Sequence, residues 1–180
     1  MTTALVSSTT ILPNATFYAN APIVISTTVQ ITSGNGILGT TTNDNACTGC
    51  YGEYKSSTTA DPTPVTSNSN YGDTGSVTLT AGDWDLCFVA RTKLNGATVS
   101  QWIVGVGTVA GNNGTGINFG DNAVDYVPGG FTNTDIFPLT ACGIRVQPTT
   151  STTYYLKHNV AYSAGSPVFA GTRFSARRIR

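Results

Sequence analysis

The residues best suited to chemistry are four cysteines and one histidine, and their spacing limits what they could do. Cys47 and Cys50 form a Cys-x-x-Cys pair. The other candidates are isolated in the sequence: Cys87, Cys142 and His158. A structural zinc site usually shows two close pairs, so a single pair fills only half of the tetrahedron. The pair is compatible with a local disulfide formed outside the reducing cytosol, with zinc as the alternative.

The surroundings of the isolated residues indicate structural roles. Cys87 and Cys142 lie in apolar, strand-like stretches, where unpaired cysteines are usually small buried residues. His158 follows Tyr154 and Leu156 on one face of a predicted strand. We therefore expect His158 in the core or at an interface, and not as a metal ligand.

No pattern for catalysis, phosphate binding or calcium binding is found in the sequence. Glu53 is the only glutamate, and the aspartates are too scattered to supply an acid/base pair. Residues 111–116 are rich in glycine but lack the lysine and the strand-to-helix context of a phosphate loop. Asp121 and Asp125 do not match the spacing of a calcium loop. We predict no enzyme, and we assign no catalytic, cofactor-binding or metal-binding residue.

The stretch 77–90 is the one around which the rest of the chain is arranged. It is typical of a strand, a turn at residues 81–83 and a second strand that begins with Trp84. Alternation places on one face of the second strand Trp84, Leu86, Phe88 and Ala90. The other face carries Asp85, Cys87, Val89 and Arg91. We interpret Trp84 as a core residue and not as a ligand-stacking one, because an indole buries much apolar area. Asp83 is interpreted as a turn residue that bonds to backbone N–H groups.

Short alternating segments separated by turns continue along most of the chain. With 20 Gly, 8 Pro and few charged residues, the composition is unfavourable for long helices. Asn95-Gly96 is a strong hairpin signal. Beyond the stretch 77–90, strands are predicted over residues 22–32, 99–109, 136–146, 153–162 and 168–179. This spacing predicts an all-β sandwich or barrel.

We divide the chain into three parts. Residues 1–50 lack the density of apolar residues that a separate core needs, so we expect an N-terminal arm, partly strand, that packs on neighbours. The alternative is a first pair of strands inside the same sandwich. Residues 51–70 carry Pro62, Pro64 and many Ser, Thr and Asn, which predicts a loop or linker. Residues 71–180 are predicted to form the β-sandwich domain.

The charge balance limits the partners that the chain can have. Its formal net charge is zero, whereas nucleic-acid binding needs a basic field that displaces counterions, so we predict no nucleic-acid partner. No stretch approaches the ~20 apolar residues of a membrane span. The N-terminus also lacks the basic region and apolar run of a signal peptide. We expect synthesis in the cytosol, no membrane partner, and a tendency to associate.

Basic residues gather at the C-terminus. The last eight residues contain Arg173, Arg177, Arg178 and Arg180. Arg173 and Arg177 share one predicted strand face, and the other two share the opposite face. One interpretation is a solvated strand end that also blunts edge-to-edge aggregation. The other is a set of interface charges that pair with the carboxylates of a partner.

Four segments of the chain carry a resemblance. They are Gly75-Ser-Val-Thr-Leu-Thr-Ala-Gly-Asp-Trp-Asp85, Asn95-Gly-Ala-Thr98, Thr152-Thr-Tyr-Tyr-Leu-Lys157 and Gly171-Thr-Arg-Phe-Ser-Ala-Arg-Arg-Ile-Arg180. In this order they resemble a group of small virion proteins of tailed bacteriophages. The resemblance covers roughly residues 71–180 and implies a jelly-roll-like antiparallel β-sandwich that is often a homotrimer. Members occur as head decoration or cement proteins and as tail-fibre domains. Residues 1–70 match no motif of the group.

The resemblance predicts a structural protein of the virion. The length suits a decoration protein better than a complete tail fibre, so we expect the chain to bind the major capsid protein and stabilise the outer head surface. The alternative is a tail-fibre or receptor-binding protein that contacts the host through loops within residues 111–135. Its contacts would then be the aromatic residues Phe119, Tyr126 and Phe131. A non-phage adhesin or lectin domain is a third reading.

Overall fold

The computed structural model describes residues 45–61, 63–65, 71–111, 123–126 and 136–179, leaving aside the side chains of 123–126. This part of the chain contains strands and no helix, so none of it is a helix of membrane-spanning length. The strands are β1 (Tyr54–Thr59), β2 (Thr63–Pro64), β3 (Tyr71–Leu79), β4 (Trp84–Lys93), β5 (Thr98–Gly107), β6 (Ala123–Tyr126), β7 (Ile136–Val146), β8 (Thr152–Ser163) and β9 (Val168–Arg178). The predicted all-β class is confirmed.

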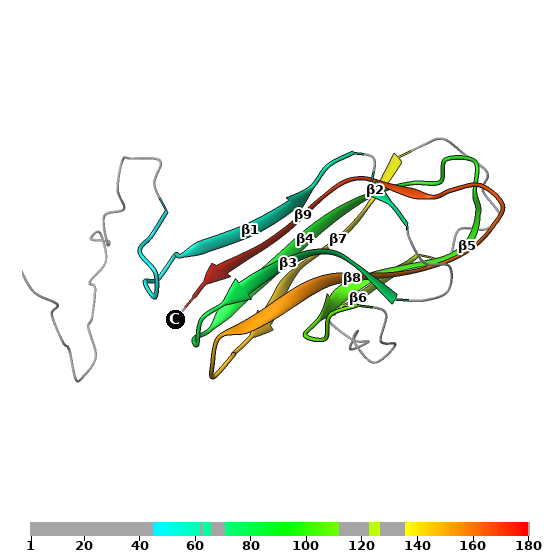
Figure 1. The fold of residues 1–180 in the computed structure, drawn as a ribbon. Coiled ribbons are helices and arrows are strands. Elements are labelled where there is room, and N and C mark those ends of the chain that lie inside the picture. The colour runs from blue at the N-terminus through cyan, green and yellow to red at the C-terminus, as the bar shows by residue number, and fades with distance from the viewer. Residues whose placement is uncertain (1–44, 62, 66–70, 112–122, 127–135, 180) are drawn as a thin grey trace, which may run out of the picture. The chain divides into compact units, whose positions relative to one another are not determined.

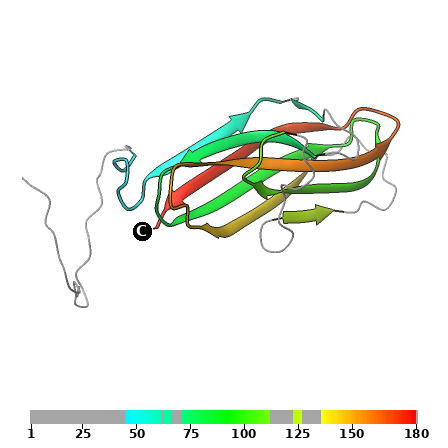
Figure 2. The same ribbon diagram turned by 60° about the horizontal axis from the view of Figure 1, so that its bottom comes forward.

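The strands form two antiparallel sheets that pack face to face (Figure 1 and Figure 2). Sheet A has the order β1-β9-β4-β7, with the short β2 also paired to β9, and sheet B has the order β3-β8-β5-β6. Most consecutive strands lie in different sheets, so the chain crosses repeatedly between the layers. This order is that of a jelly roll, and the predicted jelly-roll-like sandwich is confirmed.

The Trp84 stretch forms β4, an inner strand of sheet A. Its alternation is as predicted: Trp84, Leu86, Phe88 and Ala90 are each 0% exposed. The indole N–H of Trp84 donates to the carbonyl oxygen of Thr80 at 3.0 Å, so the one polar group of this buried ring is satisfied. Burying a Leu or Phe side chain stabilises a fold by roughly 1.5–3 kcal/mol, which makes this face a main source of stability.

Side chains from both sheets fill the space between the layers. The Trp102 ring on β5 meets Phe137 and Phe169 edge-on, with centroid distances of 6.3 and 5.4 Å. The core also includes Leu79, Leu86, Leu94, Ile144, Leu156, Val160 and Phe174. Because these residues come from strands of both sheets, the core couples the two layers.

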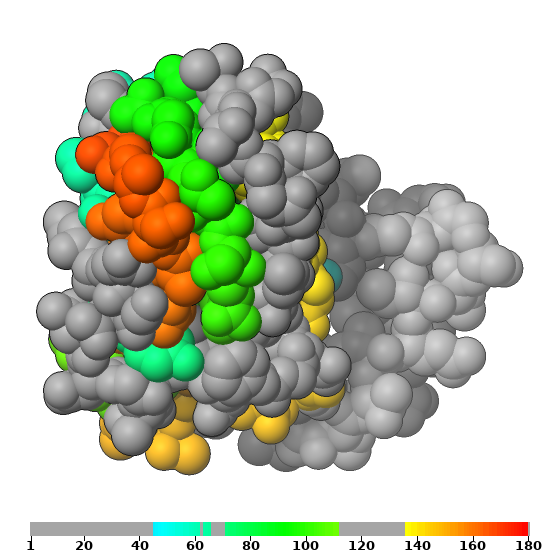
Figure 3. Space-filling model, turned by 90° about the vertical axis from the view of Figure 1, so that its right-hand side faces the viewer, coloured from blue at the N-terminus to red at the C-terminus, as the bar shows by residue number. Residues whose placement is uncertain are grey.

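Two turns meet at the end of the sandwich that faces the viewer in Figure 3. The β4–β5 turn has positive φ at both Asn95 and Gly96, as an Asn-Gly turn requires. The predicted hairpin is wrong, however, because this turn carries the chain from sheet A to sheet B and β4 does not pair with β5. The Asn95 amide donates to the carbonyl oxygen of Ser166 at 3.0 Å, in the β8–β9 turn. A Cβ at Gly165 would lie 2.4 Å from the backbone nitrogen of Ala97, so only glycine allows this contact.

Most predicted strands correspond to observed ones, whereas β1, β2 and β6 were not predicted. The predicted strands 99–109, 136–146, 153–162 and 168–179 match β5, β7, β8 and β9 to within two residues at each end. The predicted loop 51–70 is wrong for residues 54–59, which form β1 and pair with β9. β1 is a polar edge strand, so it lacks the apolar alternation that a sequence pattern needs. The predicted strand 22–32 and most of the predicted arm lie outside the described residues.

Candidate functional site

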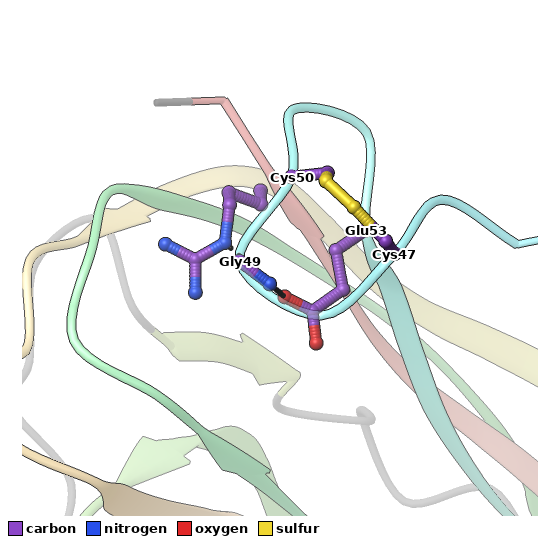
Figure 4. The surroundings of a disulfide bond; sticks show 5 residues. Cys47, Gly49, Cys50 and Glu53 are labelled. Atoms are coloured by element: carbon purple, nitrogen blue, oxygen red, sulfur yellow. Dashed lines mark hydrogen bonds and ion pairs between the residues drawn. A yellow bond between two sulfur atoms is a disulfide. The ribbon is translucent and has the colours of Figure 1, made fainter. Parts of the chain in front are cut away.

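Cys47 and Cys50 are joined by a disulfide that closes the turn before β1 (Figure 4). The Cys50 N–H donates to the carbonyl oxygen of Cys47 at 2.9 Å, and Gly49 takes a positive φ of 83°. The same turn directs the Gly49 N–H to Glu53 Oε2 at 2.7 Å. The turn therefore supplies a hydrogen bond to a carboxylate, and the disulfide alternative of the sequence analysis agrees with the geometry.

Glu53 and Arg178 form a buried ion pair next to Trp84. Arg178 Nε lies 3.2 Å from Glu53 Oε2, and the two side chains are 5% and 2% exposed. The guanidinium also donates to the carbonyl oxygen of Ala81 at 2.9 Å and to the hydroxyl of Thr80. Its carbon lies 4.4 Å from the centroid of the Trp84 ring, a cation–π distance. A buried charge is tolerated only with partners of this kind.

The carboxyl group of Glu53 is held ionised. Burial by itself would raise its pKa, but the hydrogen bonds from Gly49 and Arg178 and the positive charge of Lys55 together outweigh burial and leave the pKa below its ordinary value of 4.5. Lys55 Nζ lies 3.2 Å from Glu53 Oε1, as an ion pair without hydrogen-bond geometry. Both carboxylate oxygens therefore face cations.

Neither predicted role of Arg178 is correct. It is 4% exposed, so it is not part of a solvated strand end and does not face a partner. Alternation along β9 places it on the inner face with Phe174 and Ala176, where Glu53 provides the counter-charge. Arg180 lies outside the described residues.

A shallow open hollow of about 640 Å³ lies beside the Glu53–Arg178 pair, between the β3–β4 turn and the loop that follows β7. It is lined by Ala81, Gly82, Asp83, Gln147, Pro148 and Thr149. Its one titratable group, Asp83, receives two hydrogen bonds from Arg145, Nε to Oδ1 at 2.9 Å and Nη2 to Oδ2 at 2.5 Å. The interpretation of Asp83 as a mere turn residue missed this bidentate pair. Both carboxylate oxygens of Asp83 are therefore engaged by one guanidinium group.

Cys87 and Cys142 face each other across β4 and β7 and are joined by a second disulfide. The prediction that both are buried is wrong: Cys87 is half-buried and Cys142 is exposed. Both lie on the outer face of sheet A, where the alternation from Trp84 already placed Cys87. The register shifts beside this pair, at Gly143 with a φ of 79°, so a bulge sets the two cysteines opposite one another.

His158 is a core residue, as predicted. It is 3% exposed, its Nδ1 lies 2.8 Å from the Thr74 hydroxyl, and its ring contacts Phe169 at 5.0 Å between centroids. Burial lowers its pKa from 6.5 to about 4, so the ring is neutral at physiological pH. Within the described residues, no three metal-ligating side chains converge on one point.

Five basic side chains share the outer face of sheet A, and we call them the basic face: Arg91, Lys93, Arg145, Arg173 and Arg177. The register places Asp85 between Arg177 on β9 and Arg145 on β7. Arg173 donates to the Tyr54 hydroxyl at 2.6 Å. As predicted, Arg173 and Arg177 share one exposed face. β9 lies between β1 and β4, however, so these arginines do not protect a sheet edge.

The outer face of sheet B carries one described cation, and it is buried. Lys157 Nζ donates to Asp73 Oδ1 at 2.6 Å and to the carbonyl oxygens of Val109 at 2.7 Å and Gly111 at 3.0 Å. Asp73 Oδ2 in turn accepts the Gly111 N–H at 2.6 Å. This arrangement, the Lys157 clamp, fixes the chain where it leaves β5.

The aromatic contacts predicted within residues 111–135 are not placed by the structure. Phe119 and Phe131 lie outside the described residues, and Tyr126 belongs to β6, of which only the backbone is described. An exposed aromatic is found elsewhere: Tyr51, in the turn after Cys50, is 80% exposed. Nothing in its local sequence distinguished it from a loop residue.

Comparison with known proteins gives distant structural likenesses. No protein-family model and no curated protein matches the chain. Among solved structures, the chain is similar to the crystal structure of an infectious bursal disease virus VP2 subviral particle, at 14% identity and a TM-score of 0.42. The similarity covers 70% of this chain and 32% of that one, so the chain spans about a third of the length of its neighbour. A likeness of this size carries no information on function.

Proposed function

We propose that this chain is a structural protein of a tailed-bacteriophage virion that decorates and stabilises the outer surface of the head. The proposal starts from the segments that resemble virion proteins, which are far apart in the sequence but adjacent in the sandwich. In sheet B, β3 pairs with β8 and places Val77 opposite Tyr154. In sheet A, β4 pairs with β9 and places Trp84 opposite Arg178.

The observation that carries the proposal is the contact of Arg178 with Trp84. Thr80, Ala81 and Trp84 belong to one resembling segment and Arg178 to another, and all four meet in a single partly buried cluster in which Trp84 and Arg178 are the buried members. The segments therefore make up the framework of the sandwich and not a reactive site. A protein that resembles virion proteins in the residues that build its sandwich suits a structural role in the virion.

In this role the protein acts by mass action. A ligand that binds the assembled capsid lattice and not the free subunits stabilises the lattice by its binding free energy. The proposal includes a homotrimer bound to the major capsid protein, and release of the virion by lysis of the host cell. It assigns no catalytic activity, cofactor, nucleic-acid partner or membrane partner.

Copy number in purified virions tests the proposal. Quantitative mass spectrometry against the major capsid protein measures it directly. A copy number of the same order as that of the capsid protein supports head decoration. A few copies per virion would favour the tail-fibre alternative, and absence from the virion would refute both.

A further inference from the structure

The charges of this molecule are distributed unevenly over its two sheets. Of the nine Lys and Arg residues in the chain, five form the basic face on sheet A. The one outward carboxylate among them is Asp85, and Asp83 is paired with Arg145 at the border. On the described outer face of sheet B, the single cation Lys157 is 0% exposed. A chain with no net charge thus carries a local positive field on one side.

The middle of the basic face is occupied by small and uncharged side chains. They are Ser56, Thr58, Cys87, Val89, Thr140, Cys142 and Ser175. Arg145 and Arg177 lie at one end of this neutral centre, Arg91 and Lys93 lie at the other, and Arg173 lies between them on β9. Protein interfaces combine a centre depleted of charge with a polar rim. The basic face has this organisation.

The basic face is small for a protein interface, so we expect the protein to bind through several copies at once. The eight residue steps from Asp85 to Lys93 span about 27 Å at ~3.4 Å per residue, and four strands ~4.8 Å apart cover about 19 Å. The resulting area, roughly 500 Å², is smaller than the ≈800 Å² that each partner of a stable interface usually contributes. One copy is therefore expected to bind weakly, and several linked copies on a lattice are expected to bind through avidity.

We propose that the basic face is the surface through which the protein docks, and that its occupant is an acidic surface of a folded virion protein. This inference rests on the proposed function and names the chemistry of the lattice partner. Carboxylates of the partner would pair with the guanidinium groups around the neutral centre. A nucleic acid fits less well, because its phosphates would meet Asp85 between Arg145 and Arg177.

Sedimentation of the full-length protein with phage heads that lack it tests the inference. The variant Arg91→Gln/Arg177→Gln removes two exposed cations that have no ion-pair partner among the described residues. We expect it to bind heads about tenfold or more weakly than the wild type at about 50 mM NaCl, and by a smaller factor at about 500 mM. An unchanged urea midpoint checks that the variant is folded.

The matched control is Ser76→Glu/Ser163→Glu, which changes the net charge by the same amount on exposed positions of sheet B. It should bind within about threefold of the wild type, since charges beyond a Debye length are screened. Equal binding by the Arg91→Gln/Arg177→Gln variant and the wild type would overturn the inference alone. A duplex-DNA probe that binds the wild type as tightly as heads do would also overturn it. Failure of the wild type to bind heads would instead refute the proposed function, and the inference with it.

Discussion

Arg177 and Arg178 are neighbours in the sequence, and the sandwich uses them in opposite ways. Arg178 points into the layers, pairs with Glu53 and covers Trp84. Arg177 points outward, is exposed, and has no ion-pair partner among the described residues. The alternation of a strand separates the two. The same side chain supports the fold where its partners are internal and is available to another molecule where they are not.

The two outer faces repeat this contrast. Lys157 on sheet B uses its three donors within the molecule, the full number that an ammonium group has. On sheet A, Arg91, Lys93 and Arg177 have no such partners within the described residues. Cations committed to the fold and cations open to a partner are therefore on different sheets, and stability and binding should respond to different substitutions.

The largest expected effect comes from breaking the buried ion pair. Arg178→Met removes the guanidinium and leaves the carboxylate of Glu53 buried, with the Gly49 N–H and the ammonium group of Lys55 as its remaining described partners. Removing one partner of a buried pair typically destabilises a protein by about 3–5 kcal/mol. Urea unfolding followed by tryptophan fluorescence should show this loss in the free energy of unfolding.

Arg177→Met is the matched control, because it makes the same change one residue earlier on the exposed face. Its free energy of unfolding should stay within about 0.5 kcal/mol of the wild type. If the two variants lost equal stability, the inner and outer arginines would contribute equally to the free energy of unfolding, and the contrast drawn between them would be wrong. If Arg178→Met lost nothing, the buried pair would not stabilise the fold.

The inward position of Arg178 follows from the alternation along β9, but its partner could not be predicted. Glu53 lies 125 residues away in a segment predicted as a loop. The polar strand β1, which brings Glu53 there, exists because β9 offers it a backbone edge, and no apolar pattern within residues 54–59 records this. In contrast, the β4 core face and the Asn95-Gly96 turn depend on local periodicity and local φ, so both were predictable.

His158 can be compared with the buried charged residues Arg178 and Lys157, since it is a buried titratable group that the fold keeps neutral. Its pKa is about 4 in the folded protein and 6.5 ordinarily, chiefly because of burial, with Asp73 raising it and Lys157 lowering it. Between these values the unfolded chain binds a proton that the folded chain does not. Stability should therefore fall as the pH falls, by about 2 kcal/mol between about pH 7 and about pH 5.

His158→Gln tests this prediction, because no other histidine in the chain titrates in the same range. Urea unfolding at several pH values should show a slope for the wild type that the variant lacks, whatever its absolute stability. An equal slope in both proteins would mean that His158 is protonated in the fold, or that another group is responsible.

The pairing of Cys87 with Cys142 is a second contact that could not be predicted from the sequence. Alternation from Trp84 places Cys87 on the outer face, and this signal outweighs the general tendency of cysteines to be buried. Which residue stands opposite depends on the register of β4 and β7, and the bulge at Gly143 shifts that register by one position. Cross-strand neighbours, and hence the basic face, follow from registers that a single sequence does not reveal.

The smallest of the stability effects should come from the Lys157 clamp. Lys157→Met keeps most of the length of the side chain and removes three donors, but Asp73, with its side chain 24% exposed, can be hydrated instead. We expect a loss of about 1–2 kcal/mol in the free energy of unfolding. The more specific result is local: the Gly111 amide, which donates to Asp73, should exchange its hydrogen faster while amides of β4 do not. Lys93→Met, on the basic face, should change neither quantity. If hydrogen exchange at Gly111 were unchanged in Lys157→Met, the buried cation of sheet B would not be what holds the chain after β5. The cations of the two outer faces would then differ in their exposure alone, and not in what they do for the fold.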